Sequence, residues 1–114
     1  MNMTECIFCK ISKKEIPADI IYEEKNIIAF RDVKPKAPVH ILIIPRKHIP
    51  TVNHLEFKDK ELIGELFLIA QKIAREERVD KSGYRLIMNV GKNAGQTIEH
   101  LHLHLLGGKT LPFA

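Results

Sequence analysis

Three histidines stand at every second position near the end of the chain, in the stretch "EHLHLHLLGG", residues 99–108. They are His100, His102 and His104, and leucines fill the positions between them. Alternate side chains of a β-strand point to opposite faces, so we expect the imidazoles on one face, about 7 Å apart. A neutral imidazole can bind a metal, attack an electrophile or move a proton. The pattern therefore predicts a strand whose leucines pack on the core and whose histidines face a cleft or a subunit boundary.

The loop that precedes this strand, "GKNAGQT" (residues 91–97), has the composition of an anion-binding loop. Its glycines let backbone N–H groups approach an anion, and Gln96 and Thr97 add side-chain donors. Next to the imidazoles, the loop favours a phosphate held beside a nucleophile, because imidazole can attack phosphorus and form a covalent phospho-histidine. The chain shows no Walker-type lysine motif and no magnesium-binding carboxylate pair, so kinase or P-loop chemistry fits poorly.

The only two cysteines, Cys6 and Cys9, form a C-x-x-C pair close to the start of the chain. A thioredoxin-like redox pair follows a strand, whereas here five residues precede the first cysteine. A closed structural zinc site needs four ligands, so two histidines are expected to complete it. A pair of free thiols is the alternative interpretation.

The remaining sequence predicts the elements that must position these residues. A short helix is expected at 7–14, before Pro17, and two strands at 19–26 and 27–33 meet at a polar turn over 24–26. Residues 39–45 are nearly all apolar and predict a central strand, and 59–79 repeat apolar residues at helical spacing after Asp59, a candidate N-cap. Strands at 84–90 and 100–106 complete an α+β domain over residues 1–114, with about five strands in a mainly antiparallel sheet.

Composition narrows the class of ligand. The chain has 114 residues, a net charge of +4, no tryptophan and 6% aromatic residues, and its basic residues are dispersed. This balance suits a small anion such as a nucleotide and does not predict a nucleic-acid groove. No apolar run is long enough to cross a bilayer and the N-terminus lacks a signal-peptide pattern, so we expect a cytoplasmic protein without a membrane partner.

The histidine stretch resembles the histidine triad (HIT) superfamily, and within it the Hint branch. The family pattern His–φ–His–φ–His–φ–φ, with φ apolar, is complete at residues 100–106, and the similarity extends over "CIFCKISKKEIPADIIYE", "AFRDVKPKAPVHILIIPRKHI" and "YRLIMNVGKNAGQTIEHLHLHLLGGK". The resemblance implies a HIT-like fold that dimerises through the long helix and a strand, joining two five-stranded sheets. It also implies hydrolysis or transfer at the α-phosphate of purine nucleoside phosphoramidates, through a covalent nucleotidyl-histidine.

The resemblance assigns roles to matching positions. His102 would be the nucleophile, His104 would bond the phosphate, and His40 matches a fourth histidine near the active site. Further positions would bind the nucleotide: Asp32 at the ribose, Val33, Phe8 and Phe30 at the base, and Asn89, Gly95, Gln96 and Thr97 at the phosphate or leaving group. Without the resemblance, we would interpret Asp32 as a turn residue and Phe8 and Phe30 as core residues. His40 would be interpreted as a core histidine that is hydrogen-bonded.

The resemblance also implies one structural zinc ion per chain. Several bacterial relatives hold zinc with the C-x-x-C pair, a histidine of a "P-[RK]-K-H" segment and the first histidine of the triad. The matching residues here are Cys6, Cys9, His48 and His100. His100 would then be a zinc ligand, with its other ring nitrogen bonded to a backbone acceptor. His102 would be the residue that reacts with the substrate.

Three other functions stay open from the sequence. A dinucleoside polyphosphate hydrolase uses the same histidines, but that branch carries glutamine between the last two, where this chain has Leu103. A nucleotide-binding regulatory module and a zinc-stabilised interaction protein are the others.

Overall fold

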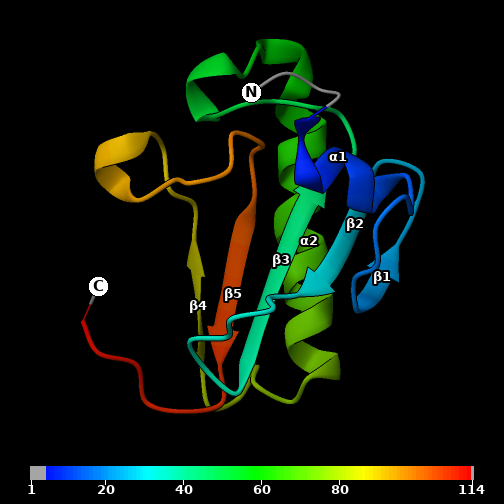
Figure 1. Cartoon of the computed structure of the whole chain (residues 1–114). Helices are drawn as coiled ribbons and strands as arrows, with labels where there is room; N and C mark the ends of the chain where they lie inside the picture. The colour runs from blue at the N-terminus through cyan, green and yellow to red at the C-terminus, as the bar shows by residue number, and fades with distance from the viewer. Residues whose placement is uncertain (1–4, 114) are drawn as a thin grey trace.

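The computed structural model describes residues 5–113, which form a five-stranded sheet with two α-helices (Figure 1). Every strand pair is antiparallel, and the strand order is β1-β2-β3-β5-β4. The predicted α+β class and five-stranded sheet are therefore confirmed. The elements are α1 (Ile7–Ser12), β1 (Ile20–Glu23), β2 (Ile27–Arg31), β3 (Val39–Pro45), α2 (Lys60–Glu76), β4 (Tyr84–Ile87) and β5 (Leu103–Gly107).

Strands β2 and β3 are nearly all apolar because both of their faces are covered. On β3, Ile41 and Ile43 join the core beneath α2, whereas Leu42 and Ile44 join a second cluster with α1. A strand with one solvated face would alternate apolar and polar residues instead. The sheet thus lies between α2 on one face and α1 on the other, and the α1 face carries the site described below.

Helix α2 packs behind the sheet in Figure 1, as its apolar spacing predicts. Leu66, Ile69 and Ile73 are buried against the leucines that alternate with the histidines, so the predicted packing of the leucine face is confirmed. Among the helices within residues 5–113, none is long and apolar enough to cross a membrane.

Asp59 stands at the N-cap position of α2, but its side chain does not cap this helix. Its carboxylate accepts a hydrogen bond from the Glu56 N–H at 2.9 Å and pairs with Lys47 at 2.8 Å. A 3₁₀ turn over Phe57–Asp59 precedes α2 and uses the carboxylate for its own capping box. The predicted N-cap is therefore correct in position and wrong in function.

Several predicted boundaries are wrong: the strands expected at 19–26 and 27–33 end at residues 23 and 31, and the helix expected at 59–79 ends at residue 76. Three others have a local cause. Helix α1 ends at Ser12 rather than at residue 14, because Lys14 has a φ of 60°, the left-handed conformation that stops a helix. Strand β5 begins at Leu103 rather than at His100, since the N–H of Leu101 bonds to the Ile49 carbonyl and leaves the ladder. Strand β4 accordingly ends at residue 87 instead of 90, where its partner strand turns away.

Candidate active site and metal centre

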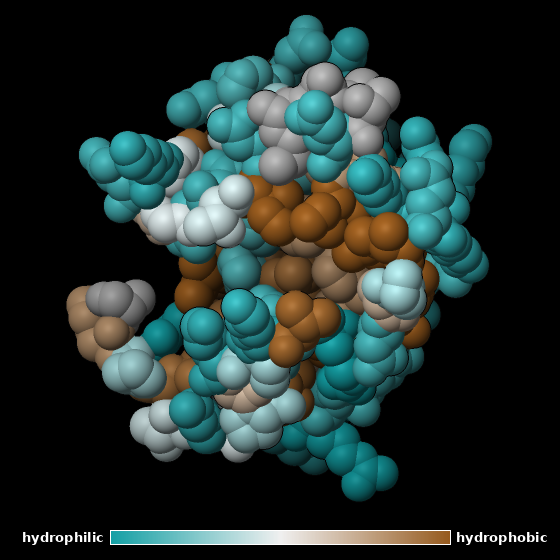
Figure 2. Space-filling model, viewed as in Figure 1, coloured by the Kyte–Doolittle hydropathy of each residue, from teal (hydrophilic) through white to brown (hydrophobic). Residues whose placement is uncertain are grey.

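A cavity of about 520 Å³ opens on the face of the sheet that carries α1. Figure 2 shows it as an apolar hollow with hydrophilic residues around its rim. Its volume lies within the range of small-molecule sites. The cavity brings together seven of the predicted nucleotide-binding residues: Phe8, Phe30, Asp32, Val33, Thr97, His102 and His104.

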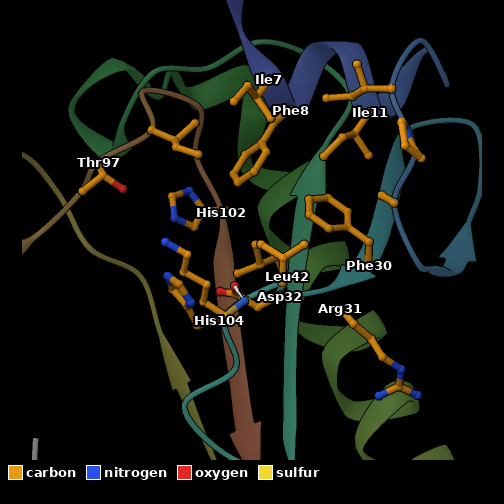
Figure 3. A pocket seen from close by; sticks show the side chains of 16 residues that line it. Ile7, Phe8, Ile11, Phe30, Arg31, Asp32, Leu42, Thr97, His102 and His104 are labelled. Carbon is orange, nitrogen blue, oxygen red and sulfur yellow. Dashed lines mark hydrogen bonds between the residues drawn. The ribbon is translucent and has the colours of Figure 1, made fainter.

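One end of the cavity is aromatic and aliphatic. Phe8 of α1 and Phe30 of β2 approach each other edge to face, with ring centroids 5.4 Å apart (Figure 3). Ile7, Ile11 and Leu42 extend this apolar wall. A flat heteroaromatic ring gains both burial and aromatic contact against such a surface.

His102 lies at the polar end, and its surroundings define which ring nitrogen carries hydrogen. Its Nδ1 atom is 2.7 Å from the carbonyl oxygen of His100. A carbonyl can only accept, so Nδ1 donates and Nε2 keeps its lone pair. Burial lowers the pKa of His102, although the bond to the His100 carbonyl raises it. The neutral ring therefore presents a nucleophilic Nε2.

His104 is fixed in the opposite sense by a relay that runs through His40. The Lys36 N–H donates to His40 Nδ1 at 3.0 Å, so the hydrogen of a neutral His40 is on Nε2. His40 Nε2 is 3.0 Å from His104 Nδ1, which must accept, and this leaves His104 with an Nε2–H donor. Register explains the contact: His104 pairs with Leu42 on β3, and His40 is the diagonal neighbour on the same face.

Both relay histidines are held neutral. Burial lowers the pKa of His104 to about 4, and the neighbouring His102 and His40 act in the same direction, against the Asp32 carboxylate. The pKa of His40 is also lowered, chiefly by burial. Asp32 Oδ2 lies 3.4 Å from His40 Nε2, which places a carboxylate beside the relay.

Asp32, His40 and His104 together offer three metal-binding atoms within 4.8 Å of one another. The Lys36 N–H nevertheless requires a lone pair on His40 Nδ1, which puts hydrogen on the Nε2 atom that would face the ion. A hydrogen-bond relay therefore satisfies these groups, whereas a metal ion would displace one of their bonds.

Gln96 holds the loop before β5 in shape. Its side-chain oxygen accepts from the Gly91 N–H at 2.8 Å, and its Nε2 group donates to the carbonyls of Pro50 and Ile98. The backbone N–H of Gln96 also bonds to the Gly91 carbonyl. All of its donors are therefore engaged within the protein.

Of the predicted phosphate contacts, Thr97 lines the cavity. Asn89, Gly95 and Gln96 do not line it, and contacts from them to a ligand stay predictions. Gly95 has a φ of 89°, a conformation that favours glycine and turns the chain toward Thr97.

Two cations that sequence reasoning missed line the cavity. Arg31 turns away from it (Figure 3). Its guanidinium makes two 2.9 Å hydrogen bonds with Glu77. Lys34 has no carboxylate at ion-pair distance within residues 5–113, so its charge is available to an anion. Its backbone N–H bonds to Asp32 Oδ1 at 2.8 Å. This turn, with an aspartate two residues before the lysine, is the sequence signal that could have identified it.

The predicted metal ligands do come together. Cys6 Sγ lies 3.3 Å from His100 Nδ1, and Cys9 Sγ lies 3.3 Å from His48 Nδ1 and 3.6 Å from His100 Nδ1. All four atoms lie within 4.8 Å of one another. A tetrahedral zinc ion separates neighbouring sulfur and nitrogen ligands by about 3.5 Å. The donor set and its spacing fit such an ion.

The groups around the four ligands also fit a cation. His100 Nε2 donates to the Pro45 carbonyl at 2.8 Å, which directs the Nδ1 lone pair toward the thiols. Burial lowers the pKa of His100 to about 4, so this lone pair is retained. Burial and the Cys6 thiol raise the pKa of Cys9 to about 11, and a bound cation would favour its thiolate.

Comparison with known proteins agrees with this geometry. Residues 13–111 match the family model described as HIT domain, a segment that begins after both cysteines. The purine nucleoside phosphoramidase of Escherichia coli K12 is 49% identical over 107 residues, covering 94% of this chain and 90% of that protein.

Solved structures show the same arrangement. A HIT family hydrolase from Legionella pneumophila superposes with a TM-score of 0.94 at 49% identity, covering 96% of this chain and 97% of that one. A histidine triad protein from Clostridium difficile superposes with a TM-score of 0.95 at 40% identity, covering 100% and 99%. The resemblance recognised in the histidine stretch is therefore confirmed, and this chain belongs to the HIT domain family.

Proposed function

We propose that this protein hydrolyses purine nucleoside phosphoramidates, such as adenosine 5′-monophosphoramidate, at the α-phosphate. The observation that carries the proposal is the hydrogen bond from His102 to the His100 carbonyl, which leaves Nε2 unprotonated beside a nucleotide-sized cavity. The E. coli relative that is 49% identical bears the name of this activity.

The cavity accommodates the parts of such a substrate in order. The purine packs against the apolar end of the cavity that Phe8 and Phe30 form together, and the ribose hydroxyls bond to the Asp32 carboxylate. The phosphate lies at the polar end, where the Thr97 hydroxyl and the Nε2–H of His104 donate to its oxygens. These donors are in place before the reaction, which is the arrangement that stabilises developing charge.

Two displacements at phosphorus complete the reaction. The lone pair of His102 Nε2 forms a bond to phosphorus while the P–N bond breaks, and its electron pair leaves with the amine, which takes up a proton from a neighbouring group. The Nδ1–H of His102 meanwhile shares the new positive charge of the ring with the His100 carbonyl. Water then attacks phosphorus, and the P–Nε2 bond breaks with its electron pair returning to His102 as the nucleoside monophosphate departs. The proton that water loses goes to the group that protonated the amine, which restores the site.

We propose that the metal is zinc, one ion per chain, held by Cys6, Cys9, His48 and His100. When bound, it supplies a cross-link between the N-terminal segment and the strand that leads to the nucleophile. The thiols must stay reduced to bind it, which accords with our expectation of a cytoplasmic location.

We also propose a homodimer that joins two sheets through α2 and β4. Phe67 and Leu68 of α2 are 45% and 65% exposed, and β4 is an edge strand of the sheet. Apolar helix residues beside an open strand edge are features that a second copy would cover.

The deciding experiment measures AMP release from adenosine 5′-phosphoramidate by the wild type and by His102→Ala. Without its nucleophile, the enzyme should lose roughly three orders of magnitude in turnover. His54→Ala, which removes an exposed histidine outside the cavity, should retain wild-type rates.

Diadenosine tetraphosphate is assayed in parallel. Faster cleavage of this dinucleotide would assign the protein to the neighbouring polyphosphate-hydrolase reaction. Binding of AMP with no turnover of either substrate would refute catalysis and leave a nucleotide-binding module.

A further inference from the structure

Phe8 lies between the two cysteines of the metal centre and also forms a wall of the cavity. We propose that occupancy of the Cys6–Cys9–His48–His100 centre sets the affinity for the nucleotide, because the bound metal holds Phe8 against the base. The inference rests on the nucleotide site proposed above and adds a coupling between two sites that the proposed reaction does not require.

Helix α1 is too short to keep its own position. It has six residues, well below the length at which an isolated helix is stable in water. Cys6 and Cys9, on either side of Phe8, contact His100 and His48, which lie 94 and 39 positions away in the sequence. The four-residue cluster therefore ties the start of α1 to the body of the protein. Apolar packing of Ile11 and a 2.7 Å hydrogen bond from Arg46 Nη1 to the Ser12 carbonyl hold its other end.

The ring of Phe8 connects this cluster to the cavity. Its centroid lies 5.9 Å from the ring of His100, a metal ligand, and 5.2 Å from the ring of His102, the nucleophile. It also contacts the ring of Phe30 edge to face, with centroids 5.4 Å apart, and Figure 3 shows the two rings beside each other. Phe8 is 4% exposed, so its ring is enclosed by these neighbours.

The hydrogen bonds that hold the nucleophile come from residues outside α1. His102 donates to the His100 carbonyl, and His100 in turn donates to the Pro45 carbonyl on β3. The N–H of the intervening Leu101 bonds to Ile49 at 2.6 Å. Release of the metal should therefore loosen the base-binding wall more than it disturbs His102, and KM should change more than kcat.

The first measurement is the Kd of AMP by titration calorimetry, with zinc-loaded wild type and with protein stripped by a chelator. Zinc content is measured by mass spectrometry and folding by circular dichroism. The stripped protein should bind AMP about tenfold more weakly, the factor expected for loss of an aromatic edge-to-face contact.

The reciprocal measurement needs only the folded, loaded protein. Linkage requires that AMP increase the zinc affinity by the same factor by which zinc increases the AMP affinity. Chelator competition with and without saturating AMP should therefore show zinc held about tenfold more tightly in the presence of AMP.

Three variants test whether Phe8, rather than a neighbouring residue, carries the coupling between zinc binding and AMP binding. Phe8→Leu should bind zinc normally, bind AMP more weakly and reduce the coupling factor to within about twofold. Phe30→Leu, which alters the neighbouring ring on β2, should weaken AMP binding but keep the coupling. Lys10→Ala, which alters an α1 residue that does not line the cavity, should leave both affinities unchanged.

Several results would overturn the inference. One is an equal AMP affinity for loaded and stripped protein with native circular dichroism, and another is full coupling in Phe8→Leu. If removal of zinc unfolds the protein, the chelator competition is the deciding measurement. A zinc affinity that is the same with and without AMP would then reject the coupling. Failure of zinc-loaded wild type to bind AMP at all would reject the proposed function, and the coupling with it.

Discussion

The hydrogen bonds from Lys36 through His40 to His104 predict that His40 is required for activity without touching the substrate. His40→Leu removes the donor that keeps hydrogen off His104 Nδ1. The ring of His104 can then adopt the other tautomer, whose Nε2 has a lone pair where the phosphate requires a donor. Leucine has nearly the volume of histidine, and position 40 is 5% exposed, so the backbone should keep its path.

The size of the effect follows from the groups left without partners. A buried hydrogen-bonding group that loses its partner costs about 1–3 kcal/mol. We expect about 1.5 kcal/mol of this to appear in the transition state, which lowers kcat/KM roughly tenfold. His40→Gln should restore most of the rate, because the amide nitrogen of glutamine can replace Nε2 as donor to His104.

The assay is AMP release from adenosine 5′-phosphoramidate, with the melting temperature of each variant as the measure of folding. Wild-type kcat/KM in a folded His40→Leu variant would refute the relay. So would an equal loss of activity in His40→Gln and His40→Leu, since that result would indicate a purely steric requirement for the ring.

Three further predictions concern the metal, pH and charge. The double variant Cys6→Ser, Cys9→Ser should lose bound zinc and melt roughly 10 °C lower, while it keeps much of the wild-type kcat. Metal analysis that finds no zinc in the purified wild type would contradict the site. His104 has a pKa of about 4 in the folded protein, below about 6.5 when unfolded, so the unfolded chain binds more protons between these values. Stability should therefore fall as pH decreases from about 6.5 to 4, and thermal melts of His104→Gln should show a shallower slope than the wild type. Lys34→Gln should raise KM about threefold, because it removes a cavity cation that has no carboxylate at ion-pair distance within residues 5–113. Lys25→Gln, which alters an exposed side chain outside the cavity, should leave KM unchanged. Equal KM values for the two variants would reject a role for the Lys34 charge.

Local patterns in the sequence were enough to predict the layers of the fold. Leucines at 101, 103 and 105 alternate with the histidines and are buried beneath α2. The apolar run of β3 is long because both faces of the strand are covered. Periodicity encodes which face of an element is buried, and it does so without knowledge of the neighbouring element.

The boundaries were less predictable, because they depend on distant partners. His100 continues the strand pattern in sequence, yet the chain around it bonds to Ile49 rather than to a neighbouring strand. Asp59 has the residue type of an N-cap, but the preceding turn and Lys47 engage its carboxylate. A competing hydrogen-bond partner decided each outcome, and residue type does not identify that partner.

By itself, then, the sequence determined the family, the sheet and the set of histidines and cysteines able to do chemistry. Only the tertiary structure decided what each imidazole can do. The His100 carbonyl leaves a lone pair on Nε2 of His102, whereas His40, 64 positions away from His104, leaves a hydrogen on Nε2 of that ring. The two histidines are identical in sequence context, with leucine on both sides. They differ because a ring tautomer depends on which donor or acceptor the fold places against Nδ1.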